Sequence, residues 1–277
     1  MSRSDIKVMI ERLSERDILL LRDVDKFRLL NTKQVQRLHF DHRHMTRLAA
    51  ARACNRVLAR LRDVNVLRAL ERRIGGVRAG SAGFVWYVGP AGERVLRELS
   101  ESRPGGRRNF REPTRLFVDH TLAVAELAIQ AIEASRTGEI EVVAVQTEPA
   151  NWQQSLSAHG TVQTLKPDLR LVTADDDYEN HWFIEVDLAT EHLPVILRQC
   201  AAYQAFRATG RYQAAHGVFP EVLWVTPTPA RKAALTAAVA ATKALDPALF
   251  RLCTTAEYGT AVTGQPDEPV PAGPVPP

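Results

Sequence analysis

The stretch from Lys166 to Asp187, KPDLRLVTADDDYENHWFIEVD, constrains the fold more than any other part of the chain. LRLV and HWFIEV have the β-branched and aromatic content of strands, and the acidic DDDYEN between them has turn composition, so a β-hairpin is predicted. Asp168 opens the first strand, and Glu185 and Asp187 end the second. Because side chains alternate faces along a strand, Glu185 and Asp187 are expected to point the same way.

The carboxylates of Asp168, Glu185 and Asp187 are therefore expected to converge at one end of the hairpin. Carboxylate oxygens suit Mg²⁺, which usually takes one or two protein carboxylates and keeps water and phosphate as its other ligands. The alternative is an exposed cluster that solvent screens at little cost and that holds no metal. The pattern predicts a magnesium site and leaves that alternative open.

Length and composition bound the class of protein. A chain of 277 residues with 45% hydrophobic content can bury a sizeable core, and this length suggests about two domains. The charged N-terminus lacks the apolar core of a signal peptide, and no run of about 18 apolar residues is present to span a bilayer. We therefore expect a cytoplasmic protein without membrane contact. The three cysteines, Cys54, Cys200 and Cys253, lie far apart and fit neither a disulfide framework nor a zinc motif.

The net charge of +4 conceals a strong asymmetry between the two halves of the chain. Residues 1–112 carry 25 Lys and Arg against 13 Asp and Glu, whereas the remainder carries 11 against 19. A basic half joined to an acidic half points to nucleic-acid contact by the basic half. The alternative is an arginine-rich surface that is simply solvated.

The basic half has the pattern of a DNA-binding module. Apolar spacing predicts helices at about 15–30, 31–40 and 46–64, the second starting from a capping box of Asn31 and Gln34. Two strands around a glycine-rich basic turn follow, and then a helix over 90–99. This is the order of a winged helix-turn-helix, in which the third helix enters the major groove and the hairpin lies along the phosphates. The expected contacts to double-stranded DNA are Arg47, Arg52, Arg56, Arg60, Arg72, Arg73 and Arg78. Solvated arginines or a protein-interaction module are the competing interpretations.

The second half has the pattern of an α/β domain. A linker rich in Pro, Gly and charge at 101–113 separates it from the winged helix at 1–100. The domain is predicted over 114–258 and its Pro-rich tail, 259–277, is expected to be disordered. Its expected elements are a helix at about 114–135, a strand at 139–148, a loop, the hairpin, a helix at 193–208, a strand at 221–226, a helix at 229–245 and a strand at 249–255.

This order, together with Pro167-Asp168 and Glu185-x-Asp187, resembles the PD-(D/E)xK nuclease superfamily. The resemblance implies a restriction-endonuclease-like α/β/α domain with a mixed central sheet, metal ligands at Glu126, Asp168 and Glu185, and DNA phosphodiester hydrolysis. The catalytic set that it implies is Asp168, Glu185, Asp187, Arg198, Gln199 and Tyr203, the last two matching a QxxxY helix motif. Asp187 stands where the superfamily has lysine, which argues against catalysis. Arg198 could steady developing negative charge in its place, but a guanidinium cannot act as the base.

Over nearly its whole length the chain resembles the replication-relaxation family of actinobacterial plasmids and related mobile elements. The resemblance is carried by RDILLLRDVDKFRLLNTKQVQRLHF, DHTLAVAEL, LKPDLRLV, FIEVDLATEH and FPEVLWVTPTPAR. It implies a DNA-binding protein of plasmid replication or DNA relaxation, with replication or conjugation proteins as partners. A magnesium-dependent DNA endonuclease or nickase is the second hypothesis, and a winged-helix transcriptional regulator is the third.

Overall fold

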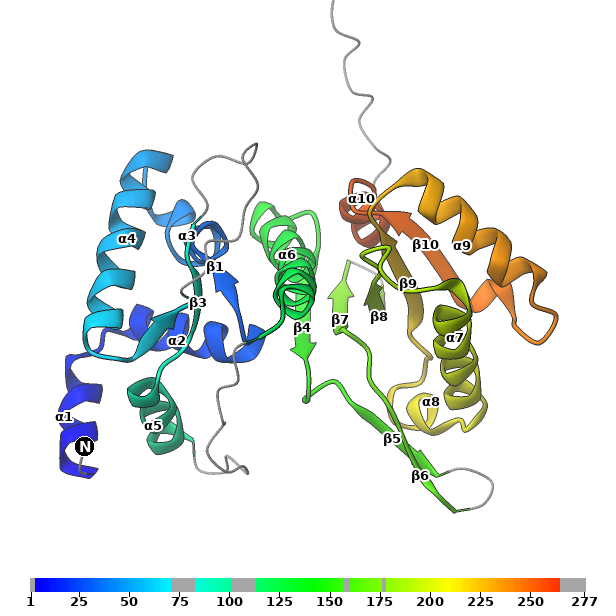
Figure 1. The fold of residues 1–277 in the computed structure, drawn as a ribbon, viewed down its shortest axis with the longest axis horizontal. Coiled ribbons are helices and arrows are strands. Elements are labelled where there is room, and N and C mark those ends of the chain that lie inside the picture. Colours follow the sequence, from blue (N-terminus) through cyan, green and yellow to red (C-terminus); the bar gives the residue numbers. More distant parts are fainter. Residues whose placement is uncertain (1–2, 71–82, 101–112, 157–159, 176–177, 265–277) are drawn as a thin grey trace, which may run out of the picture. The chain divides into compact units, whose positions relative to one another are not determined.

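The computed structural model describes residues 3–70, 83–100, 113–156, 160–175 and 178–264 (Figure 1). Arg72, Arg73 and Arg78, residues 101–112 of the predicted linker and the tail from 265 onward lie outside the described residues. The chain divides into two compact units, Met1–Ile129 and Gln130–Pro277. This division falls inside helix α6 (Arg115–Thr137), whereas the boundary expected from the sequence precedes that helix.

Unit 1 consists of helices and a small sheet. Its first five helices are α1 (Arg3–Arg12), α2 (Glu15–Phe27), α3 (Thr32–His39), α4 (Arg47–Asp63) and α5 (Pro90–Leu99). The strands β1 (Leu30–Asn31), β2 (Leu67–Ala69) and β3 (Val85–Val88) form an antiparallel sheet in the order β1-β3-β2. Helices α2 to α4, strands β2 and β3 and helix α5 follow the order predicted from the sequence, and α1 and β1 are additions to it.

Side-chain caps fix where the helices of unit 1 begin. The Asn31 side chain accepts from the Gln34 backbone N–H at 2.9 Å, and the Gln34 side chain accepts from the Asn31 N–H at 3.1 Å. This reciprocal capping box satisfies two of the backbone donors that a helix start leaves without intrahelical partners. The predicted start of α3 is therefore confirmed, and Ser14 with Asp17 makes the same box at α2.

Unit 2 is built on a mixed five-stranded sheet, so the protein is of the mixed α/β class. The strands are β4 (Glu141–Thr147), β7 (Leu169–Ala174), β8 (Glu179–Val186), β9 (Glu221–Thr226) and β10 (Phe250–Thr254). Their order is β10-β9-β8-β7-β4, with antiparallel pairing from β4 to β8 and parallel pairing from β8 to β10. Parallel neighbours need crossover connections, and these are supplied by α7 (Leu193–Ala208) with α8 (Arg211–His216), and by α9 (Pro229–Ala241).

The core of unit 2 lies between the sheet and these crossover helices. Phe183 of β8 and Trp224 of β9 pack with Tyr203 of α7 and Leu235 of α9, all at most 2% exposed. Cys54, Cys200 and Cys253 are all buried and free. Among the described residues, no helix combines the length and the apolar character that crossing a bilayer requires.

Unit 2 differs from the sequence prediction in helix α8, which was not predicted, and in two further features. A two-stranded ribbon, β5 (Gln153–Leu156) paired with β6 (Val162–Leu165), occupies the segment predicted to be a loop. Helix α10 (Tyr258–Thr263) extends into the predicted disordered tail, so that prediction is wrong for residues 259–263. Tyr258, Ala261 and Val262 of this helix are buried, and burial of apolar surface is what stabilises so short a helix.

Candidate carboxylate site and arginine face

The predicted hairpin is confirmed and brings two of its carboxylates together. Strands β7 and β8 pair antiparallel with Leu169 opposite Ile184, so Asp168 and Glu185 lie at the same end of the pair. The Val186 backbone N–H donates to Asp168 Oδ2 at 2.8 Å, which ties the start of one strand to the end of the other. Side chains alternate along each strand, and Asp168 and Glu185 therefore face the same side of the sheet.

Glu185 is buried and held by two polar neighbours. Its Oε1 accepts a hydrogen bond from the Tyr203 hydroxyl of α7, and its carboxyl also contacts that of Asp168. Burial, and next the negative charge of Asp168, raises the pKa of Glu185 well above its ordinary value. Burial and the Glu185 carboxyl likewise raise the pKa of Tyr203. Glu185 therefore retains its proton at a pH where an exposed glutamate has lost it.

Helix α7 presents the Gln199 and Tyr203 pair of the predicted QxxxY motif. The two residues are four apart and share one side of the helix. Tyr203 reaches Glu185, while the buried Oε1 of Gln199 has no hydrogen-bond partner within the described part of the chain. Arg198, predicted to stand in for the missing lysine, is exposed.

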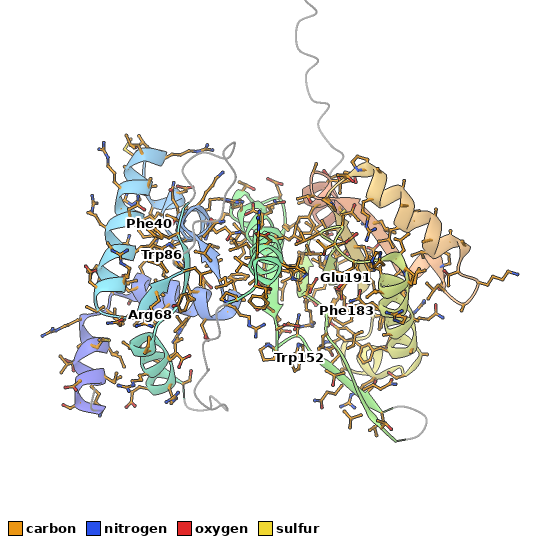
Figure 2. All side chains as sticks on the ribbon, viewed as in Figure 1. Phe40, Arg68, Trp86, Trp152, Phe183 and Glu191 are labelled. Carbon is orange, nitrogen blue, oxygen red and sulfur yellow. The ribbon has the colours of Figure 1, made fainter. Side chains whose placement is uncertain are left out.

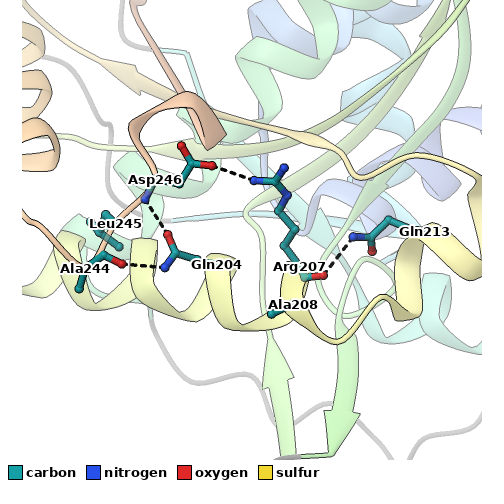
Figure 3. Close-up of a pocket in the computed structure, with 7 residues that line it drawn as sticks. All are labelled: Gln204, Arg207, Ala208, Gln213, Ala244, Leu245 and Asp246. Carbon is teal, nitrogen blue, oxygen red and sulfur yellow. Dashed lines mark hydrogen bonds and ion pairs between the residues drawn. The ribbon is translucent and has the colours of Figure 1, made fainter.

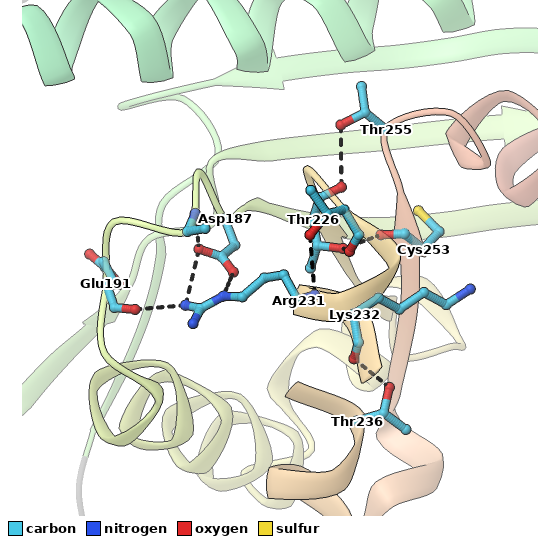
Figure 4. A network of polar contacts seen from close by, with 10 residues as sticks. Asp187, Glu191, Thr226, Arg231, Lys232, Thr236, Cys253 and Thr255 are labelled. Atoms are coloured by element: carbon cyan, nitrogen blue, oxygen red, sulfur yellow. Dashed lines mark hydrogen bonds and ion pairs between the residues drawn. The ribbon is translucent and has the colours of Figure 1, made fainter. Parts of the chain in front are cut away.

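Asp187 belongs to a separate polar network (Figure 4). Its Oδ2 accepts from Arg231 Nε at 2.6 Å, and its Oδ1 accepts from Arg231 Nη2 at 3.3 Å and from the Ala189 N–H at 2.7 Å. Arg231 also donates to the Glu191 carbonyl at 2.6 Å. The Asp187 side chain is only 1% exposed, so a bidentate arginine neutralises a fully buried carboxylate. The expected convergence of three carboxylates is therefore found for Asp168 and Glu185 but not for Asp187.

Glu126, the helix acid of the predicted metal set, lies in unit 1. Its carboxylate accepts a hydrogen bond from Gln34 Nε2 at 3.2 Å and forms an ion pair with Arg37. Gln34 and Arg37 both lie on α3. The Gln34 amide also donates to the Leu122 carbonyl at 2.9 Å, so these contacts fasten α6 to α3. A cation thus compensates this carboxylate, and metal binding by Glu126 remains a prediction.

The donor set at the carboxylate site limits the kind of cation that it could hold. No group of three or more His, Cys, Asp or Glu side chains that could hold a metal occurs in the part of the chain that the structure describes. A closed site built from protein ligands is therefore a poor fit. Two carboxylates are compatible with Mg²⁺, because this ion keeps water and substrate phosphate as its remaining ligands.

The predicted DNA-binding helix α4 has two distinct faces. Ala50, Cys54, Val57, Leu58 and Leu61 are buried against the core of unit 1, and Thr46 caps the helix start. Arg47, Arg52 and Arg56 are exposed, and no ion-pair partner for them occurs among the described residues. Arg52 and Arg56 lie on the side opposite the buried residues, and Arg47 lies at the helix start. These three arginines together are called the arginine face below.

Arg60, predicted to belong to the same row, has a structural role instead. It donates to Asp17 Oδ1 at 2.7 Å, and the Asp17 side chain is 1% exposed. Burial raises the pKa of Asp17, but hydrogen bonds from Arg60 and from Ser14 outweigh this and leave it below its ordinary value. Arg60 therefore compensates a buried charge of α2.

A hollow of about 550 Å³ at the end of α7 is separate from these sites (Figure 3). Several of its polar groups bond to one another: Gln204 bridges Ala244 and Asp246, and Arg207 pairs with Asp246 at 3.1 Å. Asp168 and Glu185 do not line it. We assign it no chemistry.

Sequence reasoning missed Arg231, although a local signal was present. Thr228 caps α9 and Pro229 begins it, so Arg231 lies in the first turn of that helix. A cation is disfavoured there by the helix dipole, and an arginine in that position indicates a specific anionic partner.

Comparison with known proteins assigns the chain to a family. The sequence profile of replication-relaxation proteins matches residues 21–222, which is most of the chain. The chain belongs to the replication-relaxation family. The family match spans α2 to the start of β9, including the arginine face, Asp168 and Glu185, but ends before Arg231. A search of curated proteins and a search of solved structures gave no significant match.

Proposed function

We propose that this replication-relaxation protein binds duplex DNA in the replication or relaxation of a plasmid or mobile element. Unit 1 acts as a winged helix-turn-helix, with α4 in the major groove. The observation that carries the proposal is the arginine face: Arg52 and Arg56 are exposed opposite the buried side of α4, and Arg47 is exposed at the start of the helix. The antiparallel β2 and β3 after α4, and the family itself, support it.

Charge supports the same function. The basic half of the chain has an excess of cations, and a helix that places cations near phosphates releases the counterions of DNA. Binding should therefore weaken steeply as salt concentration rises. The slope of the logarithm of the binding constant against that of salt should fall by about 1 for each phosphate-contacting arginine removed.

The test is duplex binding by the Arg52→Ala/Arg56→Ala variant over a range of salt concentrations. We expect an affinity loss of roughly tenfold or more at low salt, together with a shallower salt slope. Arg211→Ala is the matched control, since Arg211 is an exposed arginine of unit 2. Unchanged affinity and slope in the double variant would remove the winged-helix proposal.

The carboxylate site favours a second function, magnesium-dependent DNA hydrolysis. Asp168 and Glu185 would supply carboxylate oxygens to Mg²⁺, which would polarise a scissile phosphate and lower the pKa of a bound water. Within the chain, the Tyr203 hydroxyl orients Glu185, and the Val186 N–H orients Asp168. The aspartate at the lysine position is fully engaged by Arg231, which argues against a general base there. We therefore place hydrolysis second to DNA binding.

Supercoiled plasmid incubated with the protein and Mg²⁺ or Mn²⁺ separates the two functions. If the site is catalytic, both Asp168→Asn and Glu185→Gln should abolish nicking, while Glu139→Gln, a change at an exposed acid, should not. Absence of nicking by the wild-type protein, with duplex affinity intact, would leave DNA binding as the function.

A further inference from the structure

The β5–β6 ribbon is a part of unit 2 for which duplex binding by α4 gives no role. Leu156 pairs with Val162 near the tip, and Gln153 pairs with Leu165 at the base. The ribbon extends away from the five-stranded sheet of unit 2, with Trp152 where β5 begins (Figures 1 and 2). Because side chains alternate along the two strands, the ribbon has two faces of different character.

One face anchors the ribbon to its own unit. Ser155 is buried, and Leu165 packs against the core formed by the sheet and α7. At the base, the Asn151 amide donates to the Pro167 carbonyl, and Gln153 Nε2 donates to the Asn151 carbonyl at 3.0 Å. These contacts hold the ribbon in a defined orientation on unit 2.

The other face, called the open face here, is exposed and partly apolar. Its residues come from both strands and from the position next to the base of each strand: Trp152, Gln154, Leu156, Val162, Thr164 and Lys166. Leu156 and Val162 are each 61% exposed, and Trp152 is 39% exposed. The Lys166 ammonium lies 4.2 Å from the Trp152 ring centroid, which confirms that the two side chains share this face.

The absence of acidic residues from the ribbon segment indicates which class of ligand the open face binds. No Asp or Glu occurs between Glu148 and Asp168, although the half of the chain that contains it has more acidic than basic residues. A surface that binds a protein has no need to lack acidic residues. A surface that binds a polyanion does, because carboxylates repel the negative charges of the ligand. A single lysine is too little for a duplex backbone, but an aromatic ring, aliphatic side chains, an amide and a hydroxyl suit unpaired bases.

We propose that the open face binds single-stranded DNA, with a base stacked at Trp152, the phosphate near Lys166, and further bases against Leu156 and Val162. This site is separate from the arginine face and adds a second DNA ligand to the duplex. Lys166 is followed directly by Pro167 and Asp168, so a strand on the ribbon would lie beside the carboxylate site.

The test is binding of an oligonucleotide of about 20 thymidines to the full-length protein, since binding sites on such surfaces cover roughly 4–16 nucleotides. Fluorescence anisotropy of the labelled oligonucleotide measures binding by the wild-type protein and by every variant. Trp86, Trp182 and Trp224 are at most 5% exposed, so quenching of tryptophan fluorescence in the wild-type protein reports on Trp152. We expect Trp152→Ala to weaken binding by about tenfold or more, and Trp152→Phe to retain most of it. The Leu156→Ser/Val162→Ser variant should weaken binding as well.

Tyr178→Ala is the matched control, because Tyr178 is an aromatic residue 73% exposed outside the ribbon. A duplex of the same length provides the second arm, and its binding should be unchanged in all ribbon variants. If the wild-type protein binds the oligonucleotide but not the duplex, the α4 proposal is refuted and the single-strand proposal stands. Failure of the wild-type protein to bind the oligonucleotide, or equal binding by Trp152→Ala, would overturn it. If that failure is accompanied by self-association that Leu156→Ser/Val162→Ser abolishes, the open face is instead a contact between copies of this chain.

Discussion

Glu185 and Asp187 are two residues apart at the end of one strand, yet the protein neutralises them in different ways. Asp187 is buried against the Arg231 guanidinium, which reaches both of its oxygens. Glu185 is buried against a tyrosine hydroxyl and a second carboxyl, and burial raises its pKa. One carboxylate is thus compensated by a fixed cation, and the other by a proton.

The difference separates a structural site from an exchangeable one. A bidentate arginine cannot leave Asp187 without stranding a buried charge, so that pair is fixed. A proton on Glu185 can be exchanged for a metal ion, because a nearby cation favours the ionised form of a carboxyl. Substitutions at the arginines and at Glu185 test this distinction.

The largest effect is expected from Arg231→Met. It leaves Asp187 buried without its cation, and breaking a buried pair in this way costs about 3–5 kcal/mol of stability. Urea denaturation monitored by circular dichroism measures the loss. Adding Asp187→Asn should recover most of it, since no buried charge then remains.

Arg207→Met provides the matched comparison for that change. Arg207 and Asp246 are 46% and 48% exposed, and an exposed ion pair contributes about 0–1 kcal/mol. Equal losses of stability in Arg231→Met and Arg207→Met would show that Asp187 does not depend on its arginine.

A smaller loss of about 1.5–3 kcal/mol is expected from Arg60→Ala, the range for a hydrogen bond to a charged group. The pKa of Asp17 is below its ordinary 3.8, so its contribution to stability is present above that pH and is lost as the pH falls. Chemical denaturation over a pH series should show that the difference in the free energy of unfolding between variant and wild type narrows below pH 3.8. A gap independent of pH would mean that Arg60 acts by packing alone.

A smaller change still, of opposite sign, is expected from Glu185→Gln when it is compared with Arg231→Met and Arg60→Ala. Above pH 4.5, the ordinary value, the unfolded chain releases a proton that the folded protein keeps, so wild-type stability falls as the pH rises toward the raised pKa. Glutamine has no proton to release, and it can still accept from Tyr203. The measurement is made with a metal chelator in the buffer, so that no divalent cation occupies the site. Under these conditions we expect the Tm of the variant to exceed that of wild type at pH 8 by about 3 °C or more. A difference that does not grow between pH 5 and pH 8 would contradict proton retention by Glu185.

Local signals predicted much of the secondary structure. The Asn31 and Gln34 capping box placed the start of α3, and the predicted ranges of α5, α7 and β9 agree with the observed Pro90–Leu99, Leu193–Ala208 and Glu221–Thr226. Each carries its own determinant in the sequence, such as a proline at the helix start or a continuous apolar strand. The β5–β6 ribbon was missed because its Gln, Ser and Thr content lacks the apolar alternation of a half-buried strand.

The sequence by itself determined the mixed α/β order, the family, the β7–β8 hairpin and the pairing of Asp168 with Glu185, because strand periodicity and turn composition are local properties. Only the tertiary structure decided which charges are compensated. Asp17 meets Arg60 from another helix, Glu126 meets Arg37, and Asp187 meets Arg231, each across many residues of sequence. Such partners depend on how elements pack, and that packing assigns Asp187 to the structure and leaves Glu185 with a proton.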